Sequence, residues 1–231
     1  VYIDIKSTEV NQPIETYAGV PKDLKLVEAA PPQPTEVKLQ EIKEGVFLVG
    51  AAGTYAMFVE MDDHVVAVGG TAGIPERIKV LREVVEDKPI KFGVMTHHHN
   101  DHVLGVPAYQ AEEAVVLTVK QHEKVMRNAA TDPDELKLQF VEDKYVFDDG
   151  NRKLEVIDIG PTPHSEHLLV AWLPEEGILF EADHFPNPTN GQMAPAQPVT
   201  KRLAEALSEK GLDVKFIVGA HSPRVASIDD L

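Results

Sequence analysis

The chain has 231 residues, which fit one large domain or two small ones, and 43% of them are hydrophobic, enough for a sizeable core. Its formal net charge of −16 argues against nucleic acid and anionic membranes as partners, because an acidic surface repels phosphate groups. The absence of cysteine excludes disulfides and thiolate metal sites, so any metal must be bound by His, Asp or Glu side chains.

The first 36 residues differ in composition from the rest of the chain. Five prolines interrupt them, and the stretch "AAPPQPTE" is typical of an extended linker. We interpret residues 1–36 as a Pro-rich arm or linker, or as the tail of a removed upstream region, and residues 37–231 as one domain. The chain begins at Val1 and shows no signal-peptide pattern, so we expect a processed or trimmed N-terminus. It has no 18-residue apolar run, and we expect no membrane span.

From Val37 onward, short β-branched runs alternate with a few helical patterns. Helical apolar spacing predicts helices over residues 74–87, 120–130 and 200–212. Short apolar runs bounded by Gly, Pro or Asp predict strands over residues 45–50, 55–60, 64–70, 88–96, 114–119, 139–147, 153–160, 167–173, 177–183 and 213–222. This mixed order predicts a layered α/β protein with its helices on the outside.

A cluster of histidines follows the predicted strand over residues 88–96. In "THHHNDH" the spacing is His97-x-His99-x-Asp101-His102. Alternate residues of a tight loop can point the same way, so His97 and His99 could bind one ion while Asp101 and His102 reach a second. The alternative is a polar loop with an accidental run of histidines.

Three later predicted strands each end close to one further metal-ligand type. His164 follows "IDIGPTP", Asp183 follows "GILFEA" and His221 follows "FIVGA". The carboxyl end of the strands is the usual edge for a site on an α/β sheet. Any one of these residues alone is more often a capping or core polar group. Together with the histidine loop they predict a metal site.

These segments resemble the metallo-β-lactamase superfamily. The matching stretches are "THHHNDH", "GPTPHS", "LPEEGILFEADHF" and "VGAHS", in the order and spacing of the family, from about Val37 to His221. The resemblance implies a four-layer αββα sandwich with a dinuclear metal site at one edge. It implies a first metal held by His97, His99 and His164, a second held by Asp101, His102 and His221, and Asp183 as a bridge between them.

The resemblance also implies a chemistry. Two Zn²⁺ ions, two aspartates and a bridging hydroxide leave a site of about +1, which favours the negative charge that develops when a carbonyl is attacked. We therefore expect a zinc-dependent hydrolase whose metal-bridging hydroxide attacks an ester, thioester, lactone or amide, with a β-lactam included. Asp101 is also the candidate catalytic residue that orients the hydroxide or takes up a proton.

The chain departs from the family pattern in three places. Many relatives carry an aspartate where this chain has Gly69 and Gly70, so support for the metal loop must come from elsewhere. Many β-lactam-hydrolysing relatives carry Cys where this chain has Asp183, which favours a general hydrolase over a dedicated antibiotic-destroying enzyme. His167 stands where a small or acidic residue is common, so it is a candidate to line the pocket or to bond a ligand carboxylate. A half-exposed histidine at the start of a strand is the alternative.

Further substrate-binding candidates lie around the predicted metal site. The Pro-rich segment 183–200, with Met193, is expected to form one wall of the pocket, with a solvent-exposed connection as the alternative. Tyr55 belongs to an early hairpin that overhangs the site in relatives, and Arg224 could anchor an anionic group, although such an arginine is more often a surface residue. Among the other histidines, we expect His98 to face away from the metals. We expect His64 and His122 to face solvent, and His184 to be a supporting or surface group.

Two other functions remain open from the sequence. A ligand set without thiolate also suits iron or manganese, which allows an iron-dependent oxidoreductase on the same fold. A non-catalytic metal-binding module is the other alternative, although the complete ligand set argues against it. We expect a small-molecule substrate, while the oligomeric state cannot be read. The stretch "HSEHLLVAWLPEEGILFEADHF" resembles exported members of the family, which favours a periplasmic or secreted location over a cytoplasmic one.

Overall fold

The computed structural model describes residues 35–193 and 195–231. Residues 1–34, almost all of the proposed arm, lie outside this part, so the division into an arm and a domain stays a prediction. None of the helices in the described part of the chain combines the length and apolarity needed to cross a bilayer.

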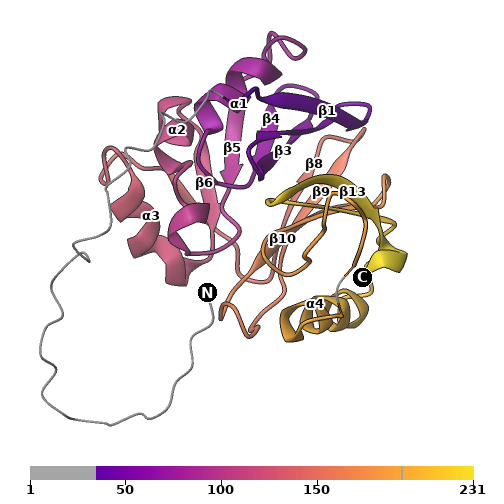
Figure 1. Cartoon of the computed structure of the whole chain (residues 1–231). Helices are drawn as coiled ribbons and strands as arrows, with labels where there is room; N and C mark the ends of the chain where they lie inside the picture. Colours follow the sequence, from indigo (N-terminus) through magenta and orange to yellow (C-terminus); the bar gives the residue numbers. More distant parts are fainter. Residues whose placement is uncertain (1–34, 194) are drawn as a thin grey trace, which may run out of the picture. The chain divides into compact units, whose positions relative to one another are not determined.

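The first sheet has seven strands in the order of the sequence (Figure 1). Its first four strands form an antiparallel meander, and the fourth to seventh are parallel. The strands are β1 (Lys38–Lys43), β2 (Val46–Ala51), β3 (Thr54–Glu60), β4 (Val65–Val68), β5 (Ile90–Val94), β6 (Val115–Thr118) and β7 (Leu138–Phe140). Parallel strands need crossover connections, and these connections carry the helices of this half of the domain.

Three short helices cover one face of the first sheet (Figure 1). They are α1 (Ile74–Leu81), α2 (Val106–Ala111) and α3 (Glu123–Ala129), with the 3-10 turns η1 (Asn100–His102) and η2 (Lys120–His122) before the second and third. In α1, Ile74, Ile78 and Leu81 recur at helical spacing and are buried against the sheet.

The second sheet has six strands in the order β13-β12-β11-β10-β9-β8. All its pairs are antiparallel except β11 with β12, which are joined through the crossover helix α4 (Pro198–Glu209). Its strands are β8 (Lys144–Asp148), β9 (Lys153–Asp158), β10 (Leu169–Leu173), β11 (Ile178–Glu181), β12 (Phe216–Gly219) and β13 (Ser222–Ser227), and the 3-10 turn η3 (Ile228–Asp230) follows. Leu203 and Leu207 of α4 pack on the outer face of this sheet.

The main core lies between the two sheets. Leu48 and Met57 of the first sheet share one cluster of buried side chains with Leu154 and Phe180 of the second, and each is at most 1% exposed. Burial of a side chain of this size stabilises the fold by about 1.5–3 kcal/mol. With α1 to α3 outside one sheet and α4 outside the other, the layers are αββα, which confirms the predicted fold.

Several predicted element boundaries were wrong. The helix expected over residues 74–87 ends at Leu81, and Val84 beyond it is 56% exposed. The single strand expected over 139–147 is two strands, β7 and β8, in different sheets, because the chain crosses from one sheet to the other between them. The last predicted strand is β12, and the returning strand β13 was missed, as were β1 and α2.

Candidate metal centre

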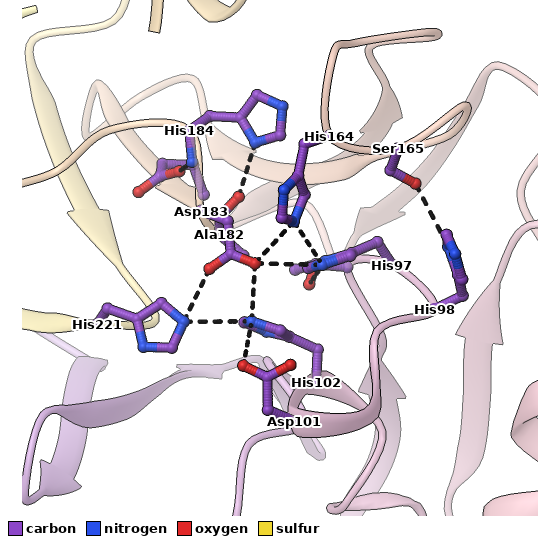
Figure 2. A network of polar contacts seen from close by, with 12 residues as sticks. His97, His98, Asp101, His102, His164, Ser165, Ala182, Asp183, His184 and His221 are labelled. Carbon is purple, nitrogen blue, oxygen red and sulfur yellow. Dashed lines mark hydrogen bonds and ion pairs between the residues drawn. The ribbon is translucent and has the colours of Figure 1, made fainter. Parts of the chain in front are cut away.

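The candidate metal ligands of both sheets lie together in one cluster (Figure 2). The histidine loop follows β5 of the first sheet and includes the turn η1. His164, Asp183 and His221 follow β9, β11 and β12 of the second sheet. The structure thus brings together all seven side chains that the sequence nominates as metal ligands.

Asp183 lies at the centre of this cluster. Its Oδ2 atom is 3.0 Å from Nε2 of His102, 3.0 Å from Nε2 of His164 and 3.2 Å from Nε2 of His97, while its Oδ1 atom is 2.8 Å from Nε2 of His221. Burial on its own would raise the pKa of Asp183, but the histidine hydrogen bonds outweigh burial and hold that pKa well below its usual range. The carboxylate is therefore charged and contacts histidines from both sheets.

The ligand atoms fall into two groups, each spanning no more than 4.8 Å. The first group is His97, His99, His164 and Asp183, and the second is Asp101, His102 and His221. Asp183 also contacts the second group through His102 and His221, so its position suits a carboxylate shared by two ions.

The donor spacing suits metal binding as well as hydrogen bonding. Nε2 of His164 is 3.1 Å from Nε2 of His97, and Nε2 of His221 is 3.2 Å from Nε2 of His102. Two nitrogens bound to one tetrahedral zinc ion at 2.0–2.1 Å stand about 3.3 Å apart. The first pair belongs to the first group and the second pair to the second, so each pair suits a separate ion. Imidazole and carboxylate donors suit zinc, iron and manganese.

Three of the candidate histidines have shifted pKa values. Burial lowers the pKa of His97 to about 4, and burial also lowers the pKa of His99. The hydrogen bond to Asp183 raises the pKa of His221. Because a histidine binds metal in its neutral form, the lowered pKa values favour metal binding at His97 and His99, whereas a proton competes more strongly at His221.

The histidine loop rests on the backbone of the glycines that follow β4. A Cβ atom added at Gly70 would lie 2.3 Å from the carbonyl oxygen of His102, so the loop packs directly against this glycine. The carbonyl of Gly70 accepts a hydrogen bond from the amide of Gly105, and the buried hydroxyl of Tyr109 donates to the carbonyl of Gly69 at 2.6 Å. Nδ1 of His102 is buried without a partner among the described residues. Backbone packing therefore supplies the support that the sequence left open.

A cavity of about 510 Å³ adjoins the cluster. Its lining is Glu181, Asp183, Phe185, Pro186, Asn187, Pro188, Gln192, Gln197, Val199, Gly219, His221 and Ser222. Most of these residues belong to the segment after β11, which confirms that segment 183–200 forms a wall of the pocket. Burial raises the pKa of Glu181, a lining residue that the sequence reading missed, to about 8. A glutamate at the end of an otherwise apolar strand was the available signal.

The proposed substrate residues lie outside this lining, and their role stays a prediction. Nη1 of Arg224 donates to Oδ1 of Asn187 at 2.7 Å and lies 3.9 Å from Sδ of Met193, while Nη2 pairs with Asp230. Arg224 and Met193 therefore lie next to a lining residue, with the charge of Arg224 already paired.

Two further candidates contact other parts of the fold. Tyr55 packs against the core between the sheets, and its amide donates to the carbonyl of Ala220 at 2.8 Å. Nδ1 of His167 donates to Oδ2 of Asp158 at 2.6 Å. Asp158 belongs to neither ligand group, so this bond is not the expected one to a ligand carboxylate.

Two expectations about the remaining histidines were wrong, and a third is narrowed. His122 was expected in solvent, but it is only 6% exposed and stacks near His98 with ring centroids 4.9 Å apart. His64 was also expected in solvent, yet its side chain is 14% exposed and packs against Phe92. His184 is fully buried, which excludes the surface position and agrees with the alternative expectation of a supporting group.

A search with protein-family models finds that the model of the metallo-beta-lactamase superfamily matches residues 68–221. This span includes the histidine loop and the three later ligand candidates. No curated protein matches the chain.

Solved structures of metallo-beta-lactamases share the fold. The enzyme from Pontibacter korlensis is 20% identical, with a TM-score of 0.65, and the alignment covers 84% of this chain and 94% of that one. FIM-1 from Pseudomonas aeruginosa, in its mono-zinc form, is 21% identical, with a TM-score of 0.64 and coverage of 86% and 93%. The enzyme from Hirschia baltica is 16% identical, with a TM-score of 0.63 and coverage of 84% and 94%. At these identities the similarity shows the fold alone.

Proposed function

The chain belongs to the metallo-beta-lactamase superfamily, and we propose that it is a hydrolase with a dinuclear zinc centre. The observation that carries the proposal is the position of Asp183, whose two carboxylate oxygens contact histidines of both ligand groups. A single carboxylate between two sets of imidazoles is suited to bridge two divalent ions.

The candidate residues would have two roles, metal binding and proton transfer. His97, His99, His164 and Asp183 would hold one ion, and Asp101, His102 and His221 the other, with Asp183 shared. When bound, two divalent ions lower the pKa of a shared water and polarise a substrate carbonyl.

Asp101 suits the proton-handling role because its side chain is 63% exposed and its Oδ2 atom lies 3.4 Å from Nε2 of His102. It can accept a proton at the mouth of the site and release it to solvent.

The pocket suits a small acyl compound. Its volume of about 510 Å³ lies in the range of small-molecule sites. Phe185, Pro186, Pro188 and Val199 give it an apolar wall. Asn187, Gln192 and Gln197 add neutral hydrogen-bonding groups. The substrate classes we propose are esters, thioesters, lactones and amides, with β-lactams included.

Metal analysis tests the centre, and a substrate panel tests the activity. We expect about two zinc ions per chain after reconstitution. A stoichiometry well below one would contradict the dinuclear centre. The panel holds chromogenic β-lactam, lactone, thioester, ester and phosphodiester substrates. Asp183→Asn should lose metal and lower turnover by several orders of magnitude, whereas Asp134→Asn, an exposed aspartate outside the site, is the matched control. Full zinc content and near-normal turnover of Asp183→Asn would refute the bridging role.

The second candidate is an iron-dependent oxidoreductase, which the His and Asp donor set also suits. Metal analysis of protein purified without added metal, together with oxygen consumption, separates the two activities. A periplasmic or secreted location belongs to the same proposal, and fractionation of the source cells tests it.

A further inference from the structure

Asp183 has a backbone conformation that aspartate seldom adopts. Its φ angle is +66°, and among the described residues only Ala52 and Glu113 share a positive φ without being glycine. The left-handed region is sterically unfavourable for a residue with a Cβ atom, so it persists only where the surroundings hold the turn. The side chain most central to the cluster therefore stands on a turn that needs support.

Glu181 supplies hydrogen bonds across this turn. Its Oε2 atom accepts from the amide of His184 at 2.8 Å and from the amide of Phe185 at 3.2 Å. These are the two amides that directly follow Asp183. Glu181 is only 2% exposed, so without its carboxyl group both buried amides would lose their partner.

The side chain of His184 also stabilises the turn, through a bond back to the residue before Asp183. Nδ1 of His184 donates to the carbonyl of Ala182 at 2.9 Å, and His184 is fully buried (Figure 2). The residues on both sides of Asp183 are thus tied together by one carboxyl group and one imidazole. The turn is fixed by local contacts that involve none of the other metal-ligand candidates.

The neighbouring strand leaves space for the glutamate. Gly219 of β12 pairs with Glu181 of β11 in the parallel register. A Cβ atom added at Gly219 would lie 2.7 Å from Oε1 of Glu181, closer than real Cβ contacts allow. Any side chain at this position would push the carboxyl group away from the turn.

We propose that Glu181 is a positioning residue of the metal centre, which holds Asp183 in its left-handed turn before an ion binds. The inference rests on the proposed metal centre. Glu181 acts through the backbone, because the oxygen that accepts the two amides can do so in either protonation state. The role therefore requires an acceptor oxygen at this place and not a charge.

Two substitutions separate the acceptor from the charge. Glu181→Gln keeps an acceptor oxygen and removes the charge, while Glu181→Met keeps a similar volume and removes the acceptor. Zinc affinity is measured by competition with a chromogenic chelator, and the absorption spectrum of the cobalt-loaded protein reports ligand geometry. We expect Glu181→Gln to bind zinc within about threefold of the unchanged chain and Glu181→Met to bind it 10- to 100-fold more weakly.

Two further variants serve as a second test and as a stability control. Gly219→Ala should also weaken zinc binding, because it displaces the carboxyl group without removing it, and it decides the question if Glu181→Met does not fold. Leu203→Ala in α4 destabilises the fold away from the site and should leave zinc affinity unchanged.

The outcomes distinguish this inference from the proposed function. If the unchanged chain binds no zinc, the proposed centre and this inference both fail. If it binds zinc but Glu181→Met, or Gly219→Ala in its place, has the same affinity, only this inference fails. An equal loss in Glu181→Gln and Glu181→Met would also overturn it, because the charge and not the acceptor would then matter.

Discussion

Replacing Gly70 with alanine should loosen the histidine loop. An added Cβ atom would lie 2.3 Å from the carbonyl oxygen of His102 and 2.4 Å from Sδ of Met95, where real Cβ atoms essentially never come within 3.0 Å. The side chain of Met95 can adjust, but the carbonyl of His102 can move only with the loop. Gly70→Asp should be worse because it also buries a carboxyl group.

The size of the effect follows from overpacking a tight contact. Such changes cost about 1–3 kcal/mol of unfolding free energy. For a domain of this length, each kcal/mol lowers Tm by about 2–4 °C, so we expect Gly70→Ala to lose about 2–12 °C. Nε2 of His102 lies 3.0 Å from Asp183, so a displaced loop should also weaken the second ligand group.

The assay compares thermal unfolding of the chelator-treated proteins and then titrates each with zinc. Ala72→Ser is the matched control, at an exposed position in the same β4–α1 connection as Gly70. Its unfolding free energy should stay within about 0.5 kcal/mol of that of the unchanged chain. Gly70→Ala should retain one tight zinc equivalent and bind the second more weakly. An unchanged Tm together with two undiminished equivalents would refute the reasoning from loop packing.

Three more predictions concern stability, pH and specificity. Tyr109→Phe removes a buried hydroxyl and leaves a carbonyl unpaired, so denaturant unfolding should show a loss of about 1–3 kcal/mol; an unchanged stability would contradict this. As pH falls, His221, whose pKa is raised, takes up a proton before His97, whose pKa is lowered to about 4, so zinc content followed by equilibrium dialysis should fall in two steps. In the metal-free protein, folding stability depends on pH in the opposite direction from zinc binding. The stabilising contribution of His221 is present at low pH and is lost as pH rises through its raised pKa. Met193→Ala should change the ratio of kcat/KM between ester and lactone substrates more than it changes Tm, and equal activity on every substrate would make the loop a mere connection.

The candidate ligands could be identified from sequence because short segments of the chain contain the residue types and spacing that indicate them. Four of them stand in one loop directly after a buried strand, and the other three each follow a recognisable strand. The edge at which strands of an α/β sheet end is a fixed property of the topology, so strand prediction was enough to place these side chains. The four layers followed from the family resemblance.

The remaining features depend on contacts that no local pattern contains. The burial of His184 could not be read from strand alternation, because the positive φ of Asp183 replaces the strand with a tight turn. His122 is buried because η2 packs beside His98 of the histidine loop, which is a tertiary contact. The segment 139–147 reads as one strand because apolar continuity does not mark where a chain changes sheets.

Because the candidate ligands are divided between the two sheets, metal binding would report whether the sheets have docked. If the backbone were cut in the connection between β7 and β8, the first fragment would carry the whole histidine loop. The second fragment would carry His164, Asp183 and His221. Neither fragment contains a complete ligand group, so high-affinity metal uptake would appear only when the fragments reassociate. Cobalt absorption could then follow the docking of two sheets in real time without an attached label.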